Sequence, residues 1–435
     1  MTSNAQRIEI LQADFLDSRL YDEDPGAGPL RLSRGAILAP ISRAFDLAER
    51  RRSGHAQRVA YVSMYLASEM ELDPDHIEGA FFAGLLHDLG MAGAATAGVA
   101  PTGEASGDSA NWAEIVKTLN LHCEIGSRIV RRLGLGEDVA RAVQHHHDCW
   151  DGSGMPGGLS GERLPVLARI LAAADRVESL FDQEASPLAL RRTAASEIAA
   201  MGGSELDPKI AEVMAELARD DGFWLGFYGE ELEPTLVSLN YGGMLEGTPL
   251  QEFIGVIADL VDSRNGRTPG HSRRVADMAG RLAEARGIPA VRTELVRTGA
   301  MLQDIGTLGV PIALLHKPDI LNVDEMATMQ LHPTYARDIL SEIPRLGPAA
   351  WWVACHHERV DGKGYPGMLE GAEVPVEAQI IGICETFEAL TNDRPHRQAM
   401  SAADAFDIIR GLAGQRFEAD VVDSFEATME ESLAS

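Results

Sequence analysis

The sequence of 435 residues contains one pattern of histidines and carboxylates twice. Corresponding residues lie 216 positions apart at the start of the pattern, as for His55 and His271, and 210 positions apart afterwards, as for His122 and His332. A repeat of this length exceeds the roughly 20 to 50 residues of solenoid units, so it predicts a duplicated globular domain. The chain length agrees, because single domains usually have about 100 to 200 residues.

The two copies of the pattern differ in completeness. The first copy consists of His55, His87, Asp88, His122, His146, His147 and Asp175. The second copy consists of His271, Gln303, Asp304, His332, His356, His357 and Glu385. Only the first copy keeps every histidine, because Gln303 takes the place that His87 has in the first copy.

Helical periodicity dominates both halves of the chain and predicts an all-α fold with two tandem helical domains. Aromatic residues and a Gly-Gly pair interrupt it once, which predicts a short, partly extended linker. The expected parts are an N-terminal cap segment (1–34), a helical domain with the complete ligand set (35–219), the linker (220–248) and a helical domain with a degenerate site (249–435).

Composition limits the partners and the location of the chain. The net charge of −28 and only four lysines disfavour a nucleic-acid groove, because phosphate backbones are bound by clustered cations. The sequence has no run of about 18 apolar residues and no secretory signal at its start, which predicts a cytoplasmic protein without a membrane span. The four cysteines form no CxxC pair and are interpreted as small buried apolar residues.

Two carboxylates of the first copy are expected on core-facing helix surfaces. Phe81 and Asp88 share a face at helical spacing, and Gly90 suits the left-handed residue that ends such a helix. Leu171 and Asp175 recur in the same way on a later helix. Because a buried carboxylate without a partner is costly, both residues require a cation or hydrogen-bond donors nearby.

Imidazoles and carboxylates together suit divalent first-row metals, of which iron or manganese is favoured and zinc is an alternative. Adjacent residues on a helix point about 100° apart, so the pairs His87-Asp88 and His146-His147 can each serve two ions. This spacing indicates a dinuclear centre bridged by Asp88. Histidines without a repeat partner are interpreted as hydrogen-bonded structural residues; these are His76, His145, His316 and His396.

The order His, His-Asp, His, His-His and Asp on helices resembles the HD superfamily of metal-dependent phosphohydrolases. The second copy is similar to the HD-GYP branch in particular, through residues 356–397 and 417–425 and the motif Gly364-Tyr365-Pro366. The first copy has Met155 in place of the tyrosine. The resemblance covers roughly residues 40–215 and 255–430, and it implies that both helical domains are HD-type domains.

The chain also departs from the HD-GYP pattern. Met91 and Thr307 stand where such members have a lysine, three residues after the aspartate. Arg51 and Arg267 stand where an acidic residue would support a third metal. A neutral amide is a weaker ligand than an imidazole, so Gln303 should reduce metal binding in the second domain.

The resemblance implies hydrolysis of a nucleotide phosphoester in the first domain, with a cyclic dinucleotide such as cyclic di-GMP as the favoured substrate. His87 and Asp88 are the predicted catalytic residues, and the predicted substrate contacts are Arg51, Gly364, Tyr365 and Pro366. The alternatives are a degenerate signalling protein that binds a nucleotide or a protein partner, and a dinuclear iron oxygenase. A homodimer and an intramolecular pseudo-dimer of the two domains are both compatible with the sequence.

Residues 91–110 lie between two predicted ligands and have almost no large side chains. With little apolar area to offset its ordering entropy, this stretch is a candidate lid over the substrate. A tolerated surface insertion is the alternative.

Overall fold

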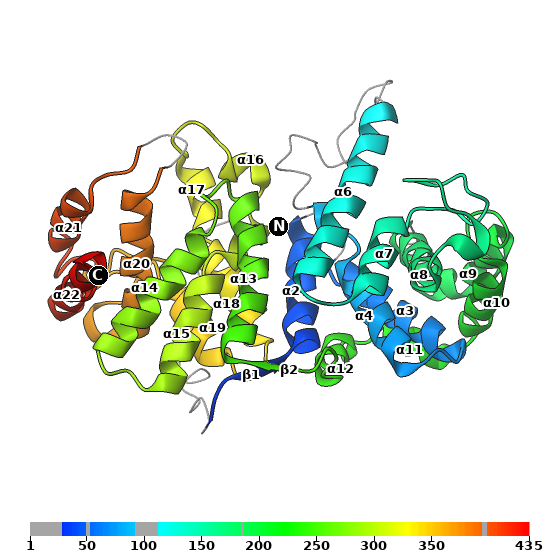
Figure 1. The fold of residues 1–435 in the computed structure, drawn as a ribbon, viewed down its shortest axis with the longest axis horizontal. Helices are drawn as coiled ribbons and strands as arrows, with labels where there is room; N and C mark the ends of the chain where they lie inside the picture. The colour runs from blue at the N-terminus through cyan, green and yellow to red at the C-terminus, as the bar shows by residue number, and fades with distance from the viewer. Residues whose placement is uncertain (1–27, 49–52, 92–111, 184–186, 394–397, 435) are drawn as a thin grey trace. The chain divides into compact units, whose positions relative to one another are not determined.

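The computed structural model describes residues 28–48, 53–91, 112–183, 187–393 and 398–434. The chain folds as two compact units. The N-terminal unit is Ser33–Met244, and the C-terminal unit is Leu245–Ser435 together with Met1–Leu32. The described residues are mostly helical in both units, which confirms the predicted all-α class (Figure 1).

The helices of the N-terminal unit are α2 (Arg34–Ala48), α3 (His55–Glu69), α4 (Pro74–Leu86), α6 (Trp112–Arg132), α7 (Glu137–His145), η2 (Gly161–Arg163), α8 (Val166–Gln183), α9 (Pro187–Met201), α10 (Pro208–Leu217), α11 (Asp221–Tyr228) and α12 (Leu232–Ser238). Its core forms where α3, α4 and α8 pack together. Val59, Phe81 and Leu171, one from each of these helices, are completely buried.

The helices of the C-terminal unit are α13 (Gly247–Arg264), α14 (His271–Ala285), α15 (Ala290–Leu302), η3 (Ile305–Gly309), α16 (Ile312–Leu315), α17 (Val323–Met329), α18 (His332–Ser341), α19 (Gly347–Ala354), η4 (Gly371–Glu373), α20 (Val376–Thr391), α21 (Ala402–Arg410) and α22 (Ala419–Ala434). Here α14, α15 and α20 pack together and bury Val275, Val296 and Ile380. Two short strands, β1 (Arg31–Ser33) and β2 (Met244–Glu246), pair in a two-stranded sheet.

The segment 220–248 differs from the predicted linker. Most of it is helical, as α11 and α12, and it belongs to the N-terminal unit up to Met244. Phe223, Trp224 and Phe227 are buried at helical spacing, and the Tyr61 hydroxyl donates a hydrogen bond to the Phe223 carbonyl at 3.1 Å. Packing against α3 therefore overrides the low helix propensity of an aromatic and glycine-rich stretch.

The helix expected to carry Asp88 ends earlier than predicted, at Leu86, so Asp88 lies in the following turn. Gly90 is not in the left-handed conformation. It is required for a close approach, because a Cβ atom there would lie 1.9 Å from the His122 carbonyl oxygen. Gly306 makes the same approach to His332 in the C-terminal unit, also at 1.9 Å. The expected helix surface of Asp175 is confirmed on α8.

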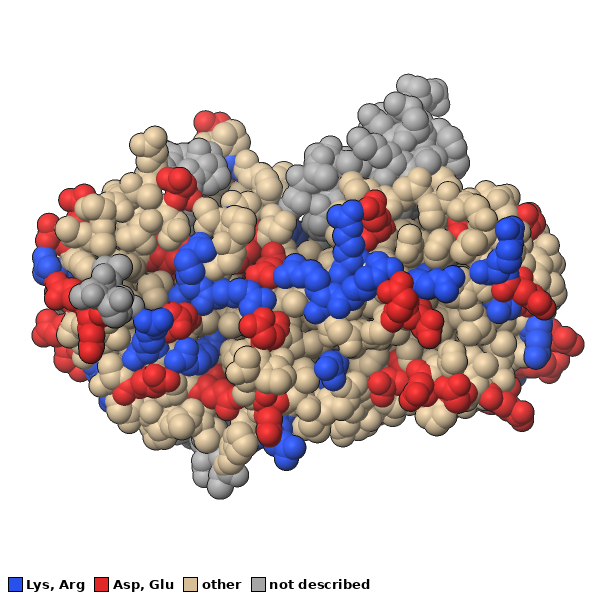
Figure 2. Space-filling view, in the orientation of Figure 1, with Lys and Arg blue, Asp and Glu red and all other residues tan. Residues whose placement is uncertain are grey.

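Most of the face drawn in Figure 2 is uncharged, and in each unit basic side chains gather on it with acidic side chains beside them. No helix among the described residues is both long and apolar enough to cross a membrane. The predicted cap 1–34 is described only from residue 28, where it contributes β1 and the start of α2. The candidate lid at 91–110 lies outside the described residues except for Met91, as does Arg51.

Candidate metal centre

Seven predicted ligands of the N-terminal unit come together at the ends and inner faces of its central helices. His55 begins α3, His122 lies on α6 and Asp175 lies on α8. The other four directly follow helices: His87 and Asp88 come after α4, and His146 and His147 come after α7. The side chain of a residue just past a helix end can point into the core even though the residue does not lie on the buried face of that helix.

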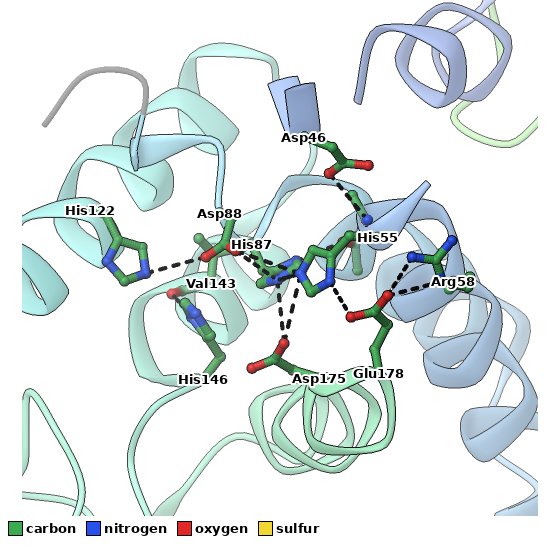
Figure 3. A network of polar contacts seen from close by, with 12 residues as sticks. Asp46, His55, Arg58, His87, Asp88, His122, Val143, His146, Asp175 and Glu178 are labelled. Atoms are coloured by element: carbon green, nitrogen blue, oxygen red, sulfur yellow. Dashed lines mark hydrogen bonds and ion pairs between the residues drawn. The ribbon is translucent and has the colours of Figure 1, made fainter. Parts of the chain in front are cut away.

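Asp88 lies between two groups of imidazoles (Figure 3). Its Oδ2 atom is 3.6 Å from His55 Nε2 and 3.4 Å from His87 Nε2. Its Oδ1 atom is 3.6 Å from His122 Nε2. One carboxylate thus directs one oxygen to each group, which is the arrangement that a bridging ligand of two ions requires.

The ligand atoms of this unit form two separate groups, each compact enough to hold an ion. His55, His87 and Asp175 form one group, with their ligand atoms all within 4.8 Å of one another. His122, Cys123, His146 and His147 form the other group by the same measure. Asp88 contacts members of both groups.

Hydrogen bonds fix the orientation of the imidazoles. Glu178 Oε2 lies 2.5 Å from His55 Nδ1, and its other oxygen accepts from Arg58 Nε at 2.9 Å. His87 Nδ1 donates to the Gly84 carbonyl at 2.9 Å, and His146 Nδ1 donates to the Val143 carbonyl at 2.7 Å. A ring that donates through Nδ1 presents the lone pair of Nε2, which is the form that binds metal.

The first group fits a divalent cation. The Nε2 atoms of His55 and His87 face each other at 3.2 Å, and each lies 3.8 Å from Asp175 Oδ1. Converging acceptors of this kind repel one another unless a proton or a cation lies between them. In the second group, His146 Nε2 is buried and has no hydrogen-bond partner in the part of the chain that the structure describes.

The pKa shifts reflect the same electrostatics. Burial opposes a charged imidazole at His55, but hydrogen bonds to Asp88 and Glu178 raise its pKa well above the usual value. At His146, burial and the imidazoles of His147 and His122 hold the pKa well below its usual value. The group with carboxylates therefore attracts positive charge, and His146 stays neutral, as a metal ligand must.

Cys123 is a member of the second group that the sequence analysis interpreted only as a small apolar residue. Its Sγ atom lies 3.6 Å from His122 Nε2 and 3.9 Å from His146 Nδ1. Burial, followed by the charge of Asp88, raises the pKa of the thiol. Burial therefore opposes ionisation of Cys123, whose sulfur borders the group.

In the C-terminal unit, the ligand atoms of His332, His356 and His357 again lie within 4.8 Å of one another. No second group of this kind occurs among the described residues of this unit. Gln303 is completely buried, and among the described residues neither polar atom of its side chain has a hydrogen-bond partner. The C-terminal equivalent of the group of His55, His87 and Asp175 therefore has an amide in place of one imidazole, although Asp304, the equivalent of Asp88, is retained.

Arg267 fills the space beside Asp304. Its guanidinium nitrogen lies 3.2 Å from Asp304 Oδ2 and 4.0 Å from Glu385 Oε1. His271 Nε2 is 3.9 Å from the same Asp304 oxygen and finds no hydrogen-bond partner within the described ranges. Although burial opposes ionisation, Arg267 and then His271 lower the pKa of Asp304 to about 2.

The Gly364-Tyr365-Pro366 motif forms part of the wall of this site. The Tyr365 ring stacks on His357 with centroids 4.8 Å apart, and Tyr365 lines a cavity of 640 Å³. Gly364 lies where a Cβ atom would be 2.5 Å from the Arg359 backbone nitrogen, so its role is to let the turn close. The cavity does not include Gly364 or Pro366 among its lining residues.

Two residues that hold the predicted ligands in place were not predicted from the sequence, although the repeat contained their signal. Glu178 and Arg58 recur as Glu388 and Arg274, at the same offsets of 210 and 216 as the ligands. Glu388 contacts His271 Nδ1 and accepts from Arg274 Nε at 3.1 Å, as Glu178 does with its partners. Matching every charged residue of the two copies, not only the ligands, would have found them.

Comparison with known proteins gives the same family in both units. The HD domain family matches residues 41–210 and 255–421. The chain is 27% identical over 416 residues to the 3'3'-cGAMP-specific phosphodiesterase 3 of Vibrio cholerae. This alignment covers 86% of this chain and 89% of that protein. The chain is also 34% identical over 178 residues to a cyclic di-GMP phosphodiesterase of Thermotoga maritima. That alignment covers 40% of this chain and 48% of the other protein.

A solved structure shares the fold. The crystal structure of a cyclic GMP-AMP specific phosphodiesterase from Vibrio cholerae superimposes with a TM-score of 0.66 at 23% identity, and covers 92% of this chain and 98% of that one. The resemblance stated from the motifs is therefore confirmed. The chain belongs to the HD domain family, and each of its two units carries a match to that family.

Proposed function

We propose that the chain is a metal-dependent phosphodiesterase that hydrolyses a cyclic dinucleotide, and that the N-terminal unit carries the catalysis. The observation that supports this most is Asp88, which directs one oxygen to each of two histidine groups. Proteins similar to most of this chain are named cGAMP-specific phosphodiesterases, and one similar to part of it is named a cyclic di-GMP phosphodiesterase.

The proposed ligands are those of the complete copy, with Asp88 as the bridge. They are His55, His87, Asp88, His122, His146, His147 and Asp175. The mixed nitrogen and oxygen donors favour iron or manganese, with zinc as an alternative. Two such ions, when bound, lower the pKa of a bound water and stabilise the charge that grows on the phosphoryl oxygens.

The protein's own contribution is to prepare this site before substrate arrives. Glu178 and the Gly84 carbonyl hold His55 and His87 with Nε2 turned inward, so no reorientation is needed on binding. His55, His87 and Asp88 are all buried, which excludes bulk water from the carboxylate. Electrostatic interactions in such a site are stronger than in water.

A degenerate signalling protein remains the competing hypothesis, and it rests on the changed C-terminal unit. The complete donor set of the N-terminal unit supports catalysis instead, because both groups there are intact. Nothing in the donor set specifically favours an oxygenase. Substrate contact by Arg51, a cytoplasmic location and a homodimer or pseudo-dimer stay predictions.

The test is hydrolysis by the full chain loaded with manganese or iron. Candidate substrates are 3'3'-cGAMP, cyclic di-GMP, a linear dinucleotide and a nucleotide monoester. We expect turnover of a cyclic dinucleotide that disappears after chelation and returns when the metal is restored. Cleavage of the monoester alone would reject the proposed substrate class, and no metal-dependent turnover of any of the four would favour the signalling hypothesis.

A further inference from the structure

Asp46 is a buried carboxylate that lies beside the group of ligand atoms that contains His55 (Figure 3). It belongs to α2, and only 3% of its surface is exposed. Its Oδ1 atom accepts a hydrogen bond from the Ala56 amide at 3.3 Å. Ala56 directly follows His55, the first residue of α3. Asp46 therefore contacts the helix turn that carries a proposed ligand, although it does not belong to the group of ligand atoms itself.

The helix α3 begins without a cap of its own. The first backbone N–H groups of any helix have no partner inside the helix, and the side chain of the preceding residue often accepts one of them. Gly54 precedes α3 in the left-handed conformation and has no side chain to do so. Asp46, from a different helix, supplies the acceptor instead. A carboxylate is also favourable there because a helix N-terminus carries partial positive charge.

The C-terminal unit repeats this arrangement. Asp262 lies 216 positions after Asp46, the same offset as for the first ligands, and only 1% of its surface is exposed. It accepts a hydrogen bond from the Ser272 amide at 3.0 Å. The helix α14 also begins after a left-handed glycine, Gly270, without a cap of its own. In both units, therefore, a buried aspartate of the preceding helix caps the helix that begins with the first histidine of the pattern.

The two units differ in the second oxygen of this aspartate. In the C-terminal unit it accepts a hydrogen bond from the Ser272 hydroxyl at 2.7 Å. The N-terminal unit has Ala56 at the equivalent position, and among the described residues Asp46 Oδ2 is buried without a hydrogen-bond partner. Burial raises the pKa of Asp46 to about 7, although the His55 imidazole and the Ala56 amide oppose the shift. A buried oxygen without a partner is unfavourable, so stability alone does not account for Asp46.

The start of α3 decides where the His55 imidazole lies. Glu178 orients the ring through Nδ1, but this contact does not fix the backbone that carries the ring. The Nε2 atom of His55 lies 3.2 Å from His87 Nε2 and 3.6 Å from Asp88 Oδ2, so a small shift of the helix would disturb both distances. Ligands have to be held within about 0.5 Å of their working positions. A hydrogen bond from α2 to the first turn of α3 provides such a restraint.

We propose that Asp46 is a positioning residue of the metal centre, which holds His55 in place by capping the first turn of α3. The residue acts through the Ala56 backbone and not as a ligand. The ion that depends on it is the one proposed for the group of His55, His87 and Asp175, whereas the ion at the other histidine group of this unit does not. This inference rests on the proposed function, since it concerns the same ions.

Manganese titration of the full chain tests the proposal, with free manganese followed by electron paramagnetic resonance. In Asp46→Ala, one ion per chain should bind about tenfold more weakly, and the other ions should keep their affinity. Asp46→Asn should stay close to wild type, because asparagine caps a helix about as well as aspartate. Asp220→Ala is the matched control. Asp220 is exposed and caps α11, a helix of the same unit without a proposed ligand, by accepting from the Gly222 amide at 3.0 Å.

Wild-type affinity in Asp46→Ala would overturn the proposal. A loss spread equally over all bound ions would also overturn it, because it would show a general loss of structure. Asp46→Asn binding as weakly as Asp46→Ala would show that the charge of the side chain acts, and not the cap. Failure of the wild-type chain to bind manganese at all is a separate result, which would reject the proposed function and this inference with it.

Ala56→Ser tests the same contact in a chain that keeps the carboxylate. The added hydroxyl can donate to the second oxygen of Asp46, as Ser272 does to Asp262. The Tm of the metal-free chain should therefore rise by about 2 to 4 °C, and manganese should bind at least as tightly as in wild type. Ser272→Ala should lower the Tm and leave the ions of the N-terminal unit unchanged. A lower Tm or weaker manganese binding in Ala56→Ser would contradict the capping contact.

Discussion

Asp88 and Asp304 occupy equivalent positions in the two units and meet different partners. Asp88 has imidazoles on both sides, with distances of 3.4 to 3.6 Å from its two oxygens. Asp304 has Arg267 at 3.2 Å on one side. The Arg267 guanidinium offsets the charge of Asp304, and its repeat equivalent, Arg51, lies outside the described residues. The described residues around these two equivalent aspartates therefore differ between the units.

The largest expected difference between the units concerns turnover. Asp88→Ala should reduce the hydrolysis rate by more than roughly 100-fold, because both ions lose their shared ligand. Loss of a residue that only supports a metal ligand can already cost roughly 100-fold. Asp304→Ala should reduce turnover far less. Initial rates with metal-loaded full chain measure both, and loss of activity in the Asp304 variant alone would reverse the roles of the units.

A smaller difference is expected one step behind the ligands. Glu178→Gln removes the carboxylate that orients His55, and such changes reduce metal affinity or activity by about 10- to 100-fold. Glu388→Gln is the matched variant of the C-terminal unit and should change turnover little. Metal titration followed by activity separates the two effects. Equal losses in both variants would show that both units take part in catalysis.

The smallest expected difference lies in the close contacts that both units share. Gly90→Ala and Gly306→Ala should each lower the stability of their own unit by about 2 kcal/mol or more, because a Cβ atom would lie 1.9 Å from a backbone oxygen. Gly347→Ala is the control, since outside its chain neighbours and its own helix no atom of the described residues lies within 4 Å of its Cβ position. Thermal unfolding measures the changes, and an unaltered Tm for Gly90→Ala would contradict the contact.

The ligand set was predictable because the repeat recorded it directly. Matching His55 with His271 and Asp175 with Glu385 requires only constant offsets. The structure groups His55 with Asp175, and it places His271 3.9 Å from Asp304 and Glu385 4.0 Å from His356. The position of Arg267 was not predictable in this way. The sequence shows an arginine four residues before His271, but whether its guanidinium reaches Asp304 depends on how the turn after α13 packs.

Two local predictions failed for reasons of tertiary structure. Aromatic residues and glycines suggested a partly extended linker, and only β2 at its end is extended, whereas Phe223 and Phe227 fold as a helix because α3 offers an apolar surface. Gly90 suggested a left-handed helix end, yet it is needed because another backbone approaches it. Both cases depend on a neighbour far away in the sequence, which local patterns do not report.

The central claim is that the N-terminal unit holds two ions and the C-terminal unit at most one. Anomalous diffraction at the manganese edge, from crystals of the manganese-loaded full chain, tests it most directly. We predict two peaks at Asp88, one on each side of its carboxylate. We also predict one peak at His332, His356 and His357, and no peak between Asp304 and Glu385. One peak on each side of Asp304, or only a single peak beside Asp88, would contradict the account.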